Sequence, residues 1–151
     1  MSRPLRIEYP GAFYHVTSRG NERKTVFQSN RDREKYLFYL ESAHERYGAV
    51  IHVYCLMGNH YHLLLETPRG NLSKILHYIN GAYTTYFNIK RSRSGHLFQG
   101  RFKGILVDGA PWASPWSLKD AHVGRHPDHT MAHSSTAKAV VFCLSGQTDS
   151  N

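Results

Sequence analysis

Two histidines, one residue apart, are the side chains of this sequence with the clearest chemical potential. His60 and His62 lie in the stretch GNHYHLLLE, whose apolar and aromatic residues are typical of a β-strand. Side chains two residues apart point to the same face of a strand, so both imidazoles project side by side and Tyr61 projects to the other face. Such a pair can hold one divalent cation if a third ligand comes from another element. The alternative is a pair of polar residues on a solvent-facing strand.

The segments around the histidines predict a β-α-β-β-α-β order, the ferredoxin-like sandwich of the α+β class with an antiparallel sheet. The turn at Gly58 and Asn59 makes the histidine strand the second arm of a hairpin. In this arrangement helices cover one face of the sheet and leave the other face for a ligand or a further helix. Residue patterns favour strands over 12–20, 49–57, 60–66 and 96–108, the last bent at Gly100, and helices over 31–48 and 72–91.

The chain is basic, with 19 Lys and Arg against 11 Asp and Glu in 151 residues and a net charge of +8. Such a charge favours nucleic acid or an anionic membrane as the partner. No apolar run reaches the roughly 18 residues of a spanning helix, and the first residues lack the apolar segment of a secretory signal. Cys55 and Cys143 form no metal or redox motif. We therefore expect a cytoplasmic protein that does not bind membranes.

The composition changes near Asp108. Residues 1–108 carry the whole net charge of +8, whereas residues 109–151 carry three basic and three acidic side chains. All ten tyrosines lie at or before Tyr86, and Pro111, Pro115 and Pro127 interrupt the last part. We predict one folded domain over 1–108 and an irregular tail over 109–151, either disordered or derived from a frameshift.

Three motifs, YHVTSRGNERKTVF, CLMGNHYHLLLE and GHLFQGRFKGILVD, occur in this order. Together they resemble the single-tyrosine HUH transposases of small insertion sequences, in particular the repetitive-extragenic-palindrome-associated tyrosine transposases, over residues 5–108. The resemblance implies a ferredoxin-like core that binds single-stranded or hairpin DNA for cleavage and strand transfer. His60, Tyr61 and His62 match the His-hydrophobic-His motif, so both histidines would ligate Mg²⁺ or Mn²⁺. A tyrosine hydroxyl would then attack the DNA and form a phosphotyrosine intermediate.

The resemblance ends where the family carries its nucleophile. That tyrosine belongs to a helix after the last core strand, in a segment similar to Tyr-Ile-x-x-Asn-Pro-Val, and a third metal ligand follows one turn later. No tyrosine follows Tyr86 here. Tyr83 and Tyr86 share a face of the second helix and are the nearest substitutes, although aromatic residues at this spacing usually belong to a core. The sequence thus predicts a transposase with impaired catalysis; the alternative is a non-catalytic nucleic-acid-binding module derived from one. Monomer and homodimer both stay open.

Several basic and polar residues are candidates for DNA contacts, because each phosphate that a cation neutralises adds salt-dependent affinity. Arg101 and Lys103 alternate with Phe102 on the expected last strand, which would make one of its faces basic. Phe27, His96 and Phe98 are candidates for stacking on unpaired bases. The alternative for any of them is a solvated side chain. The DNA-binding candidates are Arg19, Asn21, Arg23, Lys24, Asn59, Arg91, Arg93, Arg101 and Lys103.

Overall fold

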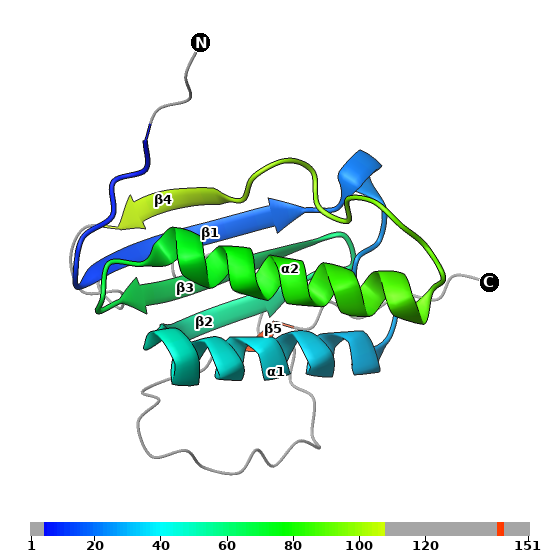
Figure 1. Ribbon diagram of the computed structural model, residues 1–151, viewed down its shortest axis with the longest axis horizontal. Helices are drawn as coiled ribbons and strands as arrows, with labels where there is room; N and C mark the ends of the chain where they lie inside the picture. The colour runs from blue at the N-terminus through cyan, green and yellow to red at the C-terminus, as the bar shows by residue number, and fades with distance from the viewer. Residues whose placement is uncertain (1–4, 108–141, 144–151) are drawn as a thin grey trace.

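Two helices pack side by side against one face of a sheet (Figure 1). The computed structural model describes residues 5–107 and, for the backbone alone, residues 142–143. Apart from that pair of residues, the predicted tail over 109–151 lies outside the described part of the chain. The elements are β1 (Ala12–Arg19), the 3-10 helix η1 (Asn21–Arg23), α1 (Asn30–Tyr47), β2 (Val50–Leu56), β3 (His60–Thr67), α2 (Leu72–Lys90), β4 (Lys103–Val107) and β5 (Phe142–Cys143).

The strand order in the sheet is β4-β1-β3-β2-β5. β1 pairs antiparallel with β3 and β4, and β2 pairs antiparallel with β3. The short β5 pairs with β2 in the parallel sense. The predicted ferredoxin-like α+β fold is confirmed. Because β3 has a strand on each side, the histidine strand occupies the centre of the sheet.

The helix-covered face of the sheet carries an aromatic core. Alternation along β3 points Tyr61 into this core, where it is fully buried and donates a hydrogen bond to Asn80 Oδ1 at 2.7 Å. The ring centroid of Tyr36 lies 5.0 Å from that of Tyr61 and 5.3 Å from that of Tyr83. Burying a large apolar side chain contributes roughly 1.5–3 kcal/mol. The same alternation sends His60 and His62 to the face without helices, as the sequence predicts.

The last strand is shorter than predicted. β4 begins at Lys103, and Gly100 turns the chain before it with a φ of +62°. The segment before that turn runs beside the end of β1, because Gln99 N donates to Arg19 O at 2.8 Å and Phe98 bridges to Gly20. Arg101 and Lys103 therefore do not alternate on one strand, and that prediction is wrong. The physical cause is the glycine turn together with the burial of the residues that precede it.

A buried carboxylate joins the two helices. Asp32, in the first turn of α1, has no exposed surface and receives hydrogen bonds from Lys90 Nζ at 2.9 Å and Arg91 Nη2 at 2.6 Å, at the end of α2. Gln28 N and the Tyr86 hydroxyl donate to the same carboxylate. Burial opposes the charge, but the hydrogen bonds from Lys90 and Arg91 outweigh it, so the pKa of Asp32 is lowered. Arg91, one of the predicted DNA contacts, is therefore engaged by this buried carboxylate in the structure.

Replacing this carboxylate should destabilise the domain. We expect Asp32→Asn to lower the free energy of unfolding by roughly 2–4 kcal/mol at pH 7, because two cations lose their partner. A lowered pKa in the folded state stabilises above the unfolded pKa of about 3.9 and is lost as the pH falls through the folded value. The difference between the two proteins should thus be constant from pH 7 to 5 and shrink below pH 4. Urea unfolding measures it, with Glu34→Gln on the exposed side of α1 as the control.

Candidate metal and DNA-binding face

His60 and His62 lie side by side on the open face of β3, each half-buried, with their ring centroids 5.1 Å apart. On one side β1 places Arg19 opposite His60 and Thr17 opposite His62. On the other side Cys55 of β2 pairs with His62. The pair is therefore held in register by both neighbouring strands.

Each histidine is oriented through its Nδ1 atom. His60 Nδ1 lies 2.8 Å from Asn59 Oδ1, and because that oxygen can only accept, Nδ1 donates and Nε2 keeps its lone pair. His62 Nδ1 lies 3.0 Å from His15 Nε2, and these two rings stack with centroids 5.2 Å apart. Metal-ligating histidines are typically fixed in this way by a partner on the other ring nitrogen.

The electrostatic surroundings favour neutral imidazoles. Burial, and then the nearby Arg19, lower the pKa of His60. Burial, and then Lys103, lower the pKa of His15. A neutral imidazole is the form that binds a metal, so the shift of His60 favours ligation near neutral pH.

The donor set fits half of a metal site. His60 and His62 offer two imidazoles on one face, but the described residues contain no group of three His, Cys, Asp or Glu that could hold a metal ion. The remaining ligands would have to be water, DNA phosphate oxygens or a residue outside the described ranges. Nitrogen ligands suit Mn²⁺ better than Mg²⁺, which prefers oxygen.

Basic and polar residues collect at the end of the sheet beside His60. Gly20 N donates to Asn59 O at 2.8 Å, and Asn59 Nδ2 donates to Arg23 O at 3.4 Å, so the loop after β1 is tied to the β2–β3 turn. Glu22 and Arg23 in η1 both have left-handed φ values, 54° and 59°. This arrangement brings together five predicted DNA contacts, which we call the basic rim: Arg19, Asn21, Arg23, Lys24 and Asn59.

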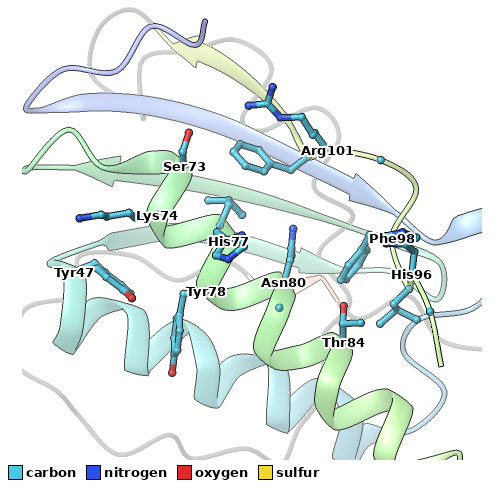
Figure 2. A pocket seen from close by; sticks show the side chains of 16 residues that line it. Tyr47, Ser73, Lys74, His77, Tyr78, Asn80, Thr84, His96, Phe98 and Arg101 are labelled. Carbon is cyan, nitrogen blue, oxygen red and sulfur yellow. The ribbon is translucent and has the colours of Figure 1, made fainter. Parts of the chain in front are cut away.

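The other predicted contacts are dispersed. Lys103 joins the open face from β4, opposite Thr17. Arg93 donates to His96 O at 3.3 Å beyond the end of α2, and Arg101 lies on the helix side of the sheet, as Figure 2 shows.

Two of the aromatic candidates are in the core instead of at a DNA-binding surface. Phe27 and Phe98 are only 2% and 8% exposed, so the prediction that they stack on bases is wrong. Both pack on core tyrosines. His96, the third candidate, is exposed.

All ten tyrosines are in the described part of the chain, and nine of them, all but Tyr9, belong to the core or pack against it. Tyr83 is fully buried on α2 and donates to Val26 O at 2.5 Å, and burial raises its pKa strongly. Tyr86 donates to Asp32 on the same helix. α2 lies across the sheet from the histidines (Figure 1). Tyr9, 43% exposed, precedes β1 at the opposite end from His60, about 23 Å away along the strand.

Comparison with known proteins identifies the family. The family model described as "Transposase IS200 like" matches residues 9–114, well over half of the chain. The chain belongs to the IS200-like transposase family. The matched region contains both histidines and all ten tyrosines. The predicted resemblance to this class of transposase is confirmed.

Two solved structures share the fold of this chain. A REP-associated tyrosine transposase bound to a REP hairpin aligns with a TM-score of 0.58 at 15% identity, over 73% of this chain and 64% of that one. A protein from Deinococcus radiodurans R1, provisionally assigned as a transposase, aligns with a TM-score of 0.53 at 18% identity, over 71% and 86%. The chain thus spans less than two thirds of the first protein. No curated protein matches it.

Neither α1 nor α2 is long and apolar enough to cross a bilayer.

The residues that sequence reasoning missed are His15 and, as an orienting partner, Asn59 in its contact with His60. The adjacency of Asn59 to His60 in the chain was a usable signal, whereas the position of His15 depends on strand register.

Proposed function

We propose that this IS200-like transposase binds hairpin or single-stranded DNA on the open face of its sheet. A divalent cation, Mn²⁺ or Mg²⁺, would be held by His60 and His62 beside a DNA phosphate, whose charge the cation would neutralise. The observation that carries the proposal is the pair of imidazoles oriented through Nδ1 next to the basic rim. In this proposal the DNA-binding domain comprises residues 1–108.

The basic rim and Lys103 supply the phosphate contacts in this proposal. They flank the histidines at the end of the central strands, where a hairpin stem could lie against both. The REP hairpin held by the structurally similar tyrosine transposase supports a hairpin as the ligand class. Each neutralised phosphate should add about −0.7 to −0.9 to the slope of log affinity against log salt concentration.

Strand cleavage and transfer through a phosphotyrosine are the finer part of the family function. A nucleophilic tyrosine has to reach the phosphate beside the metal, and the placement of all ten tyrosines away from the histidines opposes this. We infer that catalysis is impaired. The same observation favours a second candidate function, a non-catalytic module that occupies hairpin DNA.

DNA binding can be tested with a labelled stem-loop. We expect affinity for the stem-loop in Mn²⁺ to fall about 10-fold on replacing Arg19 and Lys103 together by alanine, because two phosphate contacts are lost. Fluorescence anisotropy measures this, with Arg31→Ala on exposed α1 as the control. Equal affinities for wild type and the double variant would show that the stem-loop does not bind to the open face.

The hydrogen bond from His60 to Asn59 gives a separate prediction. Asn59→Ala should weaken Mn²⁺ binding about 10-fold, because the ring loses the partner that fixes its tautomer. Isothermal titration with Mn²⁺ measures the affinity. Asn30→Ala, at the exposed start of α1, is the matched control. An unchanged affinity in Asn59→Ala would show that this contact does not orient a ligand.

The cellular setting follows from the same proposal. A DNA-binding protein with only two cysteines and no described spanning helix fits the cytoplasm. Both a monomer and a homodimer are compatible with the open face as described.

A further inference from the structure

A second surface with the chemistry of a nucleic-acid site lies on the helix side of the sheet. An open groove of about 930 Å³ runs between α2 and the segment 95–102 (Figure 2). Lys74, His77, Tyr78 and Asn80 line it from α2, and His96 and Arg101 line it from the facing segment. The sheet separates this groove from His60 and His62.

The groove is cationic. Its lining includes Lys74, Arg101 and two exposed imidazoles but no aspartate or glutamate. The Glu8 carboxylate accepts hydrogen bonds from the backbone and the hydroxyl of Ser73, so one negative charge lies at the start of α2. At the same end the Arg6 guanidinium stacks on the Phe102 ring, 3.5 Å from its centroid, which adds a further cation. The balance of charge therefore favours an anionic ligand.

The length of the groove suits a chain of nucleotides. Lining residues of α2 extend from Ser73 to Thr84, about 16 Å at about 1.5 Å per residue. Stacked nucleotides advance about 3.4 Å each, so about five would fit. His77 and His96 are exposed planar rings on the two walls, and bases stack on such rings without regard to sequence.

One wall of the groove is tied to the proposed hairpin site by hydrogen bonds. Arg19, in the basic rim, donates to Gln99 Oε1 at 2.9 Å and accepts from Gln99 N at 2.8 Å. Gln99 lies between His96 and Arg101 in the segment that forms one wall. A strand leaving a stem held at Arg19 would therefore need to pass only this segment to enter the groove.

We propose that the groove binds a short stretch of single-stranded DNA, with bases on His77 and His96 and phosphates at Lys74 and Arg101. The inference rests on the proposed function for the identity of the ligand as DNA. It adds a second site to that function. Unpaired DNA beside a hairpin would thus run along the helices while the stem lies across the sheet on the histidine face.

The test compares two ligands. Fluorescein-labelled dT6 reports on single-stranded binding, which the groove variants assign to the groove or to the histidine face. A blunt stem-loop without unpaired flanks reports on the stem at the histidine face. Replacing Lys74 and Arg101 together by glutamate should weaken dT6 binding at least about 10-fold and leave blunt stem-loop affinity within about 2-fold. Arg31→Glu with Arg69→Glu makes the same change in net charge at exposed positions away from the groove, and it should weaken dT6 binding by less than about 3-fold.

A second variant and a position-specific readout guard against misfolding. His77→Ala with His96→Ala keeps the net charge and should weaken dT6 binding about 5- to 10-fold through lost stacking. Photocrosslinking with 5-iododeoxyuridine in dT6 should modify peptides of α2 or of residues 95–101. Unchanged dT6 affinity in both groove variants, or crosslinks on β1 or β3 instead, would overturn the inference while the stem-loop result still stood. If the wild-type protein bound dT6 but not the blunt stem-loop, only the hairpin proposal would be refuted.

Discussion

No covalent protein–DNA adduct is expected when the protein is incubated with a stem-loop single strand and Mn²⁺. Attack on a phosphate requires a nucleophile about 3–3.5 Å from the phosphorus in the bound complex. Tyr83 is locked in the core by its hydrogen bond to Val26, and Tyr86 is bound to the buried Asp32. The more exposed Tyr9 is about 23 Å away along β1. All ten tyrosines of the chain lie in the part that the structure describes, and the remaining seven belong to the core or pack against it.

The adduct experiment has a clear readout. Denaturing gel electrophoresis of labelled DNA shows a phosphotyrosyl complex as a band that resists SDS and disappears after protease treatment. We expect that band to be at least about 1,000-fold below stoichiometric, the loss typical of removing a catalytic nucleophile. A robust band would disprove the proposed impairment. Tyr9→Phe, Tyr83→Phe and Tyr86→Phe would then locate the nucleophile, and mixing these variants with wild type would reveal attack between two copies.

Replacing both histidines by alanine should remove the metal-dependent part of hairpin binding. In wild type we expect Mn²⁺ to tighten stem-loop binding about 10- to 100-fold over EDTA, because the cation joins the imidazoles to a phosphate. His60→Ala with His62→Ala should bind with one affinity in both buffers. Its affinity in EDTA should match that of wild type within about 2-fold, since the basic rim supplies the phosphate contacts without the metal.

A control on the same face sharpens this comparison. His52 lies on β2, and its ring nitrogen is engaged by Glu66 Oε2 at 3.1 Å. His52→Ala should keep the full response to Mn²⁺. Should the double variant respond to Mn²⁺ as wild type does, the histidines are not the metal ligands and the non-catalytic module becomes the better account.

Periodicity was enough to predict the fold and the orientation of the histidine strand. Alternation along 60–66 alone places Tyr61 opposite both histidines, and burial of Tyr61 confirms it. The helix cap at Ser29 and the glycine stop at Gly48 likewise lie where local rules put them. These features depend on residues that are close together in the chain, so they can be predicted from the sequence.

Features that depend on distant partners could not be predicted. The ion pair between Arg91, a predicted DNA contact, and Asp32 joins residues that lie 59 positions apart in the chain. His15 meets His62 across 47 residues through the register of β1 on β3. The bend at Gly100 was predicted, but the sequence did not show that β4 begins only at Lys103, so that Arg101 lies outside it. The burial of Phe98 before the bend depends on tertiary packing. Tertiary packing also places Arg19 and Lys103 on the histidine face and Arg101 on the helix side of the sheet.

The most direct measurement of the central claim is Mn²⁺ binding by the DNA-free protein, followed by electron paramagnetic resonance. The account predicts one Mn²⁺ per chain in wild type, with nitrogen hyperfine coupling from imidazole, and at least about 100-fold weaker binding in His60→Ala with His62→Ala. The Mn²⁺ affinity of His52→Ala should equal that of wild type. Equal Mn²⁺ affinity in wild type and the double variant, or a spectrum without imidazole nitrogen coupling, would contradict the account.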